Sequence, residues 1–142
     1  MGSGGKLSRT SSRSFEIASE VLVQRLRRRT DIQRVFREGQ RVQSGALVLQ
    51  ARRRGPDEAA ICGPRLTVIA ARRFPSAVAR NRARRIMREA SRVLLRDTRE
   101  PWDVVVVVRP EAVEEPYRDR LAGLAELFHR AGVLSDHTVA VS

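Results

Sequence analysis

The sequence predicts a small single-domain α+β sandwich, in which one sheet packs against helices. Three segments carry apolar residues at helical spacing, and short runs of β-branched and other apolar residues lie between them. Their order along the chain is helix, strands, helix, strand, helix, which is typical of one sheet with helices packed against it. A length of 142 residues suits one such domain with a single modest core.

The two ends of the chain differ in composition from its middle. Residues 1–14 are rich in glycine and serine and hold almost no apolar side chains, which is typical of a flexible segment. We expect residues 1–24 to form a flexible N-terminal extension, part of which could derive from a cloning vector. Residues 25–134 are expected to form the folded domain, and residues 135–142 a short C-terminal tail.

The folded domain is expected to begin with a short helix. Thr30 or Asp31 can cap it, because both side chains carry an oxygen that accepts a hydrogen bond from a free N–H of the first turn. Ile32 and Phe36 lie four residues apart and therefore share one face of this helix. Gly39 can end it.

Three strands are expected to form the sheet. Residues 45–52 and 65–71 are apolar and β-prone, and the segment 52–58 between them reads as a charged turn. Residues 102–109 include five consecutive valines at 104–108, which is typical of a strand buried on both faces.

Two longer helices complete the prediction. The last one, at about 116–131, spaces its apolar residues by four, three and four positions, as expected of an ordinary packing helix: Tyr117, Leu121, Leu124 and Phe128. The other, residues 77–96, has two faces on a helical wheel. An arc of roughly 120° is apolar and holds Ala83, Ile86, Met87, Ala90, Val93 and Leu94. An arc of roughly 160° is basic and holds Arg80, Asn81, Arg84, Arg85, Arg88, Arg92 and Arg96.

The charge of the chain points to a polyanionic partner. The formal net charge is +12, and residues 25–99 alone hold 21 arginines against 6 acidic residues. Such a field attracts nucleic acid first and anionic membrane second. No run of about 18 uncharged apolar residues exists, so a membrane span is excluded. The single cysteine excludes an internal disulfide framework.

The basic face of the 77–96 helix could be a solvated surface or a docking surface for RNA or DNA phosphates. Arginines four residues apart repel one another, and the middle of the chain holds few acidic residues to relieve them, which favours docking. Insertion into a membrane surface is disfavoured, because the apolar arc is rich in alanine and lacks Trp and Phe.

This helix also carries a motif. Arg80-Asn81-Arg82 is followed by Arg84-Arg85 and Arg88-Glu89, and the segment resembles the RNR signature helix of the bacterial ribonuclease P protein subunit. Other segments agree in order and spacing. Residues 26–39 resemble the family's opening basic stretch and first helix, and Arg72-Arg73 resembles its paired basic residues. Residues 103–109 resemble its buried strand, and residues 117–134 resemble its closing helix. The resemblance covers about residues 25–134.

The resemblance implies a left-handed βαβ crossover, the rarer hand. It also implies that the protein carries no catalytic residue, because a large RNA holds the catalytic Mg²⁺ ions and removes the 5′ leader of precursor tRNA. We expect a cytoplasmic protein, monomeric within the ribonucleoprotein, whose partners are the catalytic RNA and precursor tRNA. No organic cofactor and no membrane partner are expected.

Two sets of residues carry the implied contacts. The RNA-binding surface would consist of Arg72, Arg73, Arg80, Asn81, Arg82, Arg84, Arg85 and Arg88. The single-stranded leader would lie in a cleft between the first helix and the sheet, lined by Ile32, Phe36, Val48 and Gln50. The family often has aromatic residues at the positions of Ile32 and Gln50, so we expect weaker leader contact here. Phe36 could stack on a base or pin the first helix to the core.

The sequence gives weaker support for other functional sites. A zinc site at His129 or His137 is disfavoured, because neither has a Cys or an acid at ligand spacing, and Cys62 reads as a small buried residue. Glu111, Glu114 and Glu115 could belong to a nuclease that acts alone, although Pro110 and Pro116 bracket them as a solvated loop. A structural RNA-binding protein, ribosomal or involved in assembly, remains the alternative function.

Overall fold

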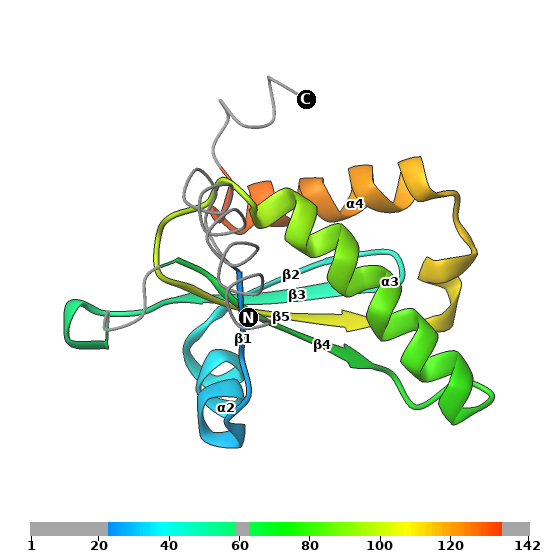
Figure 1. The fold of residues 1–142 in the computed structure, drawn as a ribbon, viewed down its shortest axis with the longest axis horizontal. Helices are drawn as coiled ribbons and strands as arrows, with labels where there is room; N and C mark the ends of the chain where they lie inside the picture. Colours follow the sequence, from blue (N-terminus) through cyan, green and yellow to red (C-terminus); the bar gives the residue numbers. More distant parts are fainter. Residues whose placement is uncertain (1–22, 59–62, 135–142) are drawn as a thin grey trace, which may run out of the picture.

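The computed structural model describes residues 23–58 and 63–134. Expectations for the N-terminal extension up to residue 22, for Cys62 and for the tail with His137 lie outside these residues. Within them the predicted α+β class is confirmed: three helices pack on one mixed five-stranded sheet (Figure 1).

The sheet has the strand order β1-β4-β5-β3-β2. Its strands are β1 (Gln24–Arg25), β2 (Gln40–Ser44), β3 (Leu47–Arg53), β4 (Arg65–Ala70) and β5 (Trp102–Val108). Strand β5 lies at the centre, parallel to β4 and antiparallel to β3. The three predicted strands are therefore present, and the valine run occupies the position between two neighbours.

The two edge strands were missed by the sequence analysis. Strand β2 is polar and pairs with β3 as a hairpin, and β1 is only two residues long, so neither carries an apolar pattern. The predicted strand start at residue 45 was wrong, because Gly45 and Ala46 form the two-residue turn between Ser44 and Leu47. Gly45 has a φ of 57°, a conformation that favours glycine.

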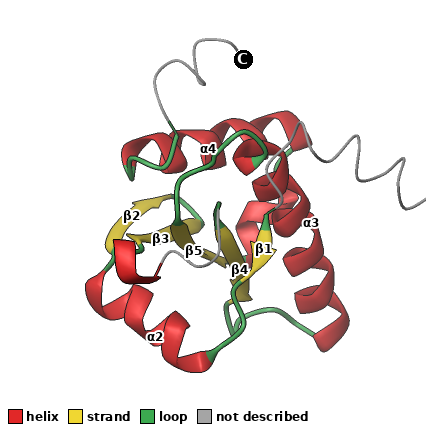
Figure 2. Ribbon diagram, turned by 60° about the vertical axis from the view of Figure 1, so that its left-hand side comes forward, coloured by secondary structure: helices red, strands yellow, loops and turns green. Residues whose placement is uncertain are grey.

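The helices are α2 (Arg29–Glu38), α3 (Ala77–Leu95) and α4 (Tyr117–Arg130), with short 3₁₀ helices at Pro56–Glu58 and Pro110–Glu114. Figures 1 and 2 show α3 and α4 on one face of the sheet and α2 on the other. With α3 in front of the sheet and β4 below β5 in Figure 1, the β4–α3–β5 crossover is left-handed, as the resemblance implied.

The predicted cap of α2 was wrong. The helix begins at Arg29, its N-cap is Arg28, and no side chain caps it, so Thr30 and Asp31 lie within the first turn. The Asp31 carboxylate instead lies 3.5 Å from the Arg65 guanidinium, an ion pair that links α2 to the sheet. Helix α3 does have a side-chain cap, because Ser76 Oγ accepts a hydrogen bond from the Ala79 N–H at 3.1 Å.

The sheet divides the apolar interior into two unequal parts. Alternate residues of β3 and β5, such as Leu49, Val104 and Val106, face α3 and α4 and belong to the large core cluster. The other face is smaller: Val105 packs with Leu26 and with Val35 of α2. Because α2 is short, it covers this face only in part, and Val107 beside it is partly exposed.

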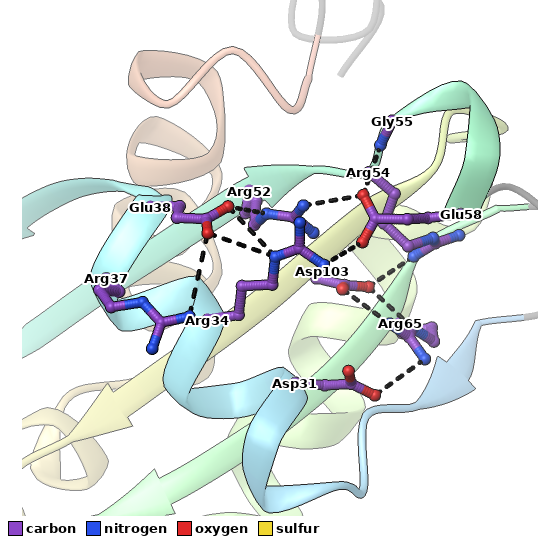
Figure 3. Close-up of polar contacts among 10 residues, drawn as sticks. All are labelled: Asp31, Arg34, Arg37, Glu38, Arg52, Arg54, Gly55, Glu58, Arg65 and Asp103. Carbon is purple, nitrogen blue, oxygen red and sulfur yellow. Dashed lines mark hydrogen bonds and ion pairs between the residues drawn. The ribbon is translucent and has the colours of Figure 1, made fainter.

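The segment predicted as a charged turn is an ion-pair network (Figure 3). Strand β3 runs on to Arg53, and Arg54 is buried, with its guanidinium donating to the Asp103 carboxylate and to the Gly63 carbonyl. Arg65 donates to the same carboxylate at 2.8 and 2.7 Å. Several of the arginines in the basic middle of the chain therefore stabilise the fold and are not available to a partner.

Candidate nucleic-acid interface

Helix α3 presents a basic face that the core does not use. Its buried residues are Ala83, Met87, Ala90, Ser91 and Leu95. The predicted apolar arc was slightly misplaced, since Val93 is 42% exposed while Ser91 is fully buried. The buried stripe lies closer to Ser91 than expected, and the arginines on that side, Arg84 and Arg88, are partly buried.

The ion pairs within the described residues include none with six arginines of this helix, namely Arg80, Arg82, Arg84, Arg85, Arg88 and Arg92. Asn81, Arg82 and Arg85 are exposed, and Arg80, Arg84 and Arg88 are partly buried. Across residues 23–58 and 63–134, every ion pair found involves an arginine outside α3. A solvated face held by salt bridges was the competing interpretation, and it does not fit these contacts. The face carries charge that an anionic partner could neutralise.

Arg72 and Arg73 lie in the exposed loop that leads into α3. The Arg73 guanidinium lies 3.2 Å from the Glu111 carboxylate, with 64% and 58% of the two side chains exposed. An exposed pair of this kind contributes only about 0–1 kcal/mol. Arg73 can therefore exchange Glu111 for a phosphate at small cost, and it lies at the same end of α3 as Arg80.

A groove runs between α3 and the edge of the sheet. It encloses about 540 Å³ and is lined by Arg25 of β1, by Leu66, Thr67 and Val68 of β4, and by Asn81, Arg84 and Arg88 of α3. The three α3 residues are three and four positions apart, which places them along one side of the helix. Arg25 was not among the predicted site residues, because two exposed residues of an edge strand leave no periodic signal.

The four residues of the expected leader cleft come together on the α2 side of the sheet. Val48 and Gln50 alternate with the core residues of β3, and they pair with Val107 and Val105 of β5. Ile32 packs against the small cluster beneath α2. Phe36 is 42% exposed, so it does not pin α2 to the core; the fully buried Val35 does that.

The sequence analysis missed part of this surface. Thr67 and Ile69 of β4 and Val107 of β5 are partly exposed and lie on the same face as Val48 and Gln50. Strand alternation could have found them once the pairing of β4 with β5 was known, because Thr67 pairs with Val105 and Ile69 with Val107.

Two other candidates lie in the described residues, His129 and the acidic segment with Glu111. His129 is partly buried in α4, and no group of three or more His, Cys, Asp or Glu side chains there could hold a metal ion. Most of the acidic segment expected as a loop is a 3₁₀ helix, which ends at Glu114 and is followed by Glu115, and the side chains of Glu111, Glu114 and Glu115 are exposed. No helix in the described part of the chain is long and apolar enough to cross a membrane.

Comparison with known proteins decides the family. A model of the Ribonuclease P family matches residues 23–132, a range that includes α3, the groove and the α2 face of the sheet. The chain belongs to the ribonuclease P protein family.

Individual members of the ribonuclease P family agree over nearly their full length. The ribonuclease P protein component of Cyanothece sp. is 34% identical over 122 residues, which cover 78% of this chain and 93% of that protein. The component of Roseiflexus castenholzii is 39% identical over 113 residues, covering 78% of this chain and 87% of that protein.

Solved ribonuclease P proteins share the fold. The protein of Thermotoga maritima matches with a TM-score of 0.61 at 28% identity, over 75% of this chain and 96% of that chain. The protein of Staphylococcus aureus matches with a TM-score of 0.67 at 23% identity, over 80% of this chain and 100% of that chain.

Proposed function

We propose that this chain is the protein subunit of ribonuclease P, which binds the catalytic RNA and the 5′ leader of precursor tRNA and promotes removal of the leader. The observation that carries the proposal is the face of α3, where Arg82 and Arg85 are exposed and no described carboxylate pairs with them, in a chain of this family. A ribosomal or assembly role would use the same charge, but the family membership does not favour it.

In this proposal α3 docks on the catalytic RNA through phosphate contacts. The guanidinium group is planar and offers two parallel N–H donors to a phosphate, so it fixes orientation as well as charge. Arg72, Arg73, Arg80, Asn81, Arg82, Arg84, Arg85 and Arg88 make up this surface. If six arginines each met one phosphate, log K would fall with log[salt] at a slope of roughly −5.

The leader would lie across the opposite face of the sheet, beneath α2. Phe36 offers an exposed ring on which one base can stack, and Val48 forms part of the apolar floor. Ile32 and Gln50 offer no aromatic ring, so stacking on this surface depends on Phe36 alone among the four predicted residues. The leader contact is therefore expected to be weaker than one with three rings.

The chemistry stays with the RNA in this proposal. The catalytic Mg²⁺ ions would be held mainly by the RNA subunit, and the protein, as a monomer in the cytoplasm, would bind and orient the two RNAs. A nuclease centred on Glu111, Glu114 and Glu115 is disfavoured, because Glu111 pairs with Arg73 and all three side chains are exposed.

Reconstitution tests the proposal. The chain is added to a bacterial ribonuclease P RNA at low magnesium concentration, and the cleavage of precursor tRNA at the 5′ end of the mature sequence is measured. We expect strong stimulation over the RNA alone, and no cleavage by the protein alone. A protein that leaves the rate of the RNA unchanged would contradict the proposed function, and cleavage without RNA would favour the nuclease.

A further inference from the structure

The groove between α3 and the sheet brings together arginines from two distant parts of the chain. Arg84 and Arg88 enter it from α3, and Arg25 enters it from β1, the short strand on the outer edge of β4. Strand β1 pairs only with Arg65 and Leu66, so Thr67 and Val68 line the groove beyond the end of that pairing. The groove is therefore open at the edge of the sheet.

None of the described residues that line this groove is acidic. Arg25 and Arg88 form no ion pair with any described residue, and the Arg84 guanidinium donates only to the Asn81 side-chain oxygen, at 2.5 Å. Two other groups of arginines do have carboxylates: Arg54 and Arg65 share Asp103, and Arg34 and Arg52 share Glu58. Among the described residues, the three arginines of the groove therefore come together without an anion.

This crowding has a measurable electrostatic consequence. Burial, followed by the charges of Arg25, Arg92 and Arg84, lowers the pKa of the Arg88 guanidinium below its usual value. Arg88 remains charged at neutral pH, so the repulsion among these cations is present in the folded protein. An anion between them would remove it.

The donors in the groove suit a phosphate group. Guanidinium forks match the tetrahedral oxygens of a phosphate, and the Asn81 amide offers further N–H donors beside them. A volume of about 540 Å³ admits a phosphate with its ribose. The groove also continues the exposed arginine face of α3, so a chain of phosphates bound along that face would reach it.

We propose that this groove binds one phosphodiester of the RNA docked on α3, held jointly by Arg25, Arg84 and Arg88. This inference rests on the proposed function for the source of the phosphate. It adds to the RNA-binding surface a residue outside the arginine helix, Arg25. It also means that the RNA is held against two elements, α3 and the sheet edge, so its orientation relative to the leader face is fixed.

A double-mutant cycle on binding to the ribonuclease P RNA tests the shared phosphate. Arg25→Ala and Arg88→Ala are each expected to weaken binding about tenfold. Because both side chains contact one phosphate, the double variant should lose clearly less affinity than the product of the two single fold-losses. It should also reduce the slope of log K against log[salt] by about one. The matched control is Arg25→Ala with Arg82→Ala. Since Arg82 lies outside the groove, the fold-losses of affinity of these two variants should multiply, and the salt slope should fall by about two. If the affinity losses of Arg25→Ala and Arg88→Ala multiply in the double variant, the shared phosphate site is wrong.

A second measurement tests three claims separately: that the groove binds phosphate, that this phosphate belongs to RNA, and that the protein has the proposed function. Inorganic phosphate is titrated into the full chain without RNA, and NMR signals of the Asn81 side chain and the Thr67 amide are followed. We expect both to shift in the wild type and not in Arg25→Ala/Arg88→Ala, with Arg99→Ala, exposed and outside the groove, as the charge-matched control. Absence of the shifts would overturn the groove as a phosphate site.

The other outcomes concern the source of the phosphate and the function. If the signals shift but the two variants show no coupling in RNA binding, the groove binds free phosphate and the proposed RNA source is wrong. If the signals shift and the variants are coupled in RNA binding, but the protein does not stimulate cleavage, the groove is a phosphate site and the proposed function is refuted.

Discussion

The Arg54 guanidinium and the Asp103 carboxylate form an ion pair in the interior, and each side chain is only 2% exposed. Arg54 follows β3 and Asp103 is the second residue of β5, so the contact joins positions 49 residues apart. Arg65 of β4 donates to both oxygens of the same carboxylate. One carboxylate thus pairs with two arginines at this end of the sheet, the buried Arg54 and the partly buried Arg65.

Asp103→Asn should destabilise the protein strongly. The substitution keeps the size of the side chain but removes the charged carboxylate that pairs with the buried Arg54 guanidinium, and breaking a buried pair in this way costs about 3–5 kcal/mol. The free energy of unfolding in urea measures the effect. Glu100→Gln is the matched control, because the Arg53–Glu100 pair is 57% and 56% exposed and is expected to contribute under about 1 kcal/mol. Equal losses for the two variants would contradict this role of Asp103.

Acid should weaken the fold through Glu58. Its carboxylate accepts hydrogen bonds from Arg52, from the Gly55 backbone N–H and from Arg34, and the first two, together with the nearby positive charges, lower its pKa from 4.5 to about 2. A lowered pKa means that the unfolded chain binds the proton more readily, so this stabilisation is complete above about pH 4.5 and is lost as the pH falls towards 2.

Urea unfolding between pH 2 and 6 checks the Glu58 prediction. Wild-type stability should fall over this range more steeply than that of Glu58→Gln. Glu114→Gln, at an exposed carboxylate without an ion pair in the described residues, should follow the wild type. Parallel curves for wild type and Glu58→Gln would show that the network around Glu58 contributes nothing to the pH dependence.

The outer face of α3 should bind RNA through contacts with phosphates. Arg82→Ala with Arg85→Ala removes two exposed arginines that have no described ionic partner, so we expect unchanged stability and weaker binding to the catalytic RNA. The slope of log K against log[salt] should become shallower by about two. Filter binding at several salt concentrations measures it, with Arg99→Ala/Arg118→Ala as the charge-matched control. An unchanged slope would refute phosphate docking on this face.

Phe36 should matter for the leader and not for the fold. Its ring is 42% exposed, so Phe36→Leu keeps an apolar side chain at this position of α2 and removes the stacking surface. Loss of one stacked base weakens binding by about 1–3 kcal/mol. Affinity for precursor tRNA with a single-stranded leader should fall, while affinity for mature tRNA, measured in the same reconstituted enzyme, should stay the same. Equal losses for both substrates would place Phe36 outside the leader contact.

Gly39 should tolerate no side chain. A Cβ there would lie 2.5 Å from the Val35 carbonyl oxygen and 2.8 Å from the Ala51 carbonyl oxygen, and both are backbone atoms that cannot rotate away. Gly39→Ala is expected to cost about 1–3 kcal/mol, because α2 must move away from β3. Gly123→Ala in α4 is the control: its Cβ meets nothing within 4 Å, and stability should rise by about 0.5–1 kcal/mol. Thermal unfolding of both variants compares them, and a stable Gly39→Ala would contradict the close approach.

Local patterns in the sequence were sufficient for the elements that have a strong period. The amphipathic period of 77–96 predicted α3 and its basic face, and the five valines predicted β5, because side-chain periodicity follows from backbone geometry alone. Edge strands β1 and β2 carry no such period, since half of their neighbours are solvent. Pairing with β4 and β3 forms them, and that pairing is decided by the rest of the sheet.

The roles of individual arginines could not be predicted in the same way. Arg54 and Arg84 have the same chemistry in the sequence, but the fold brings Asp103 to the first and no acid to the second. By itself the sequence determined the family, the helices and the total charge, since these depend on residue type and spacing. Only the tertiary structure decided which charges are neutralised inside the protein and which remain for a partner, because an ion pair depends on distances between residues far apart in the chain.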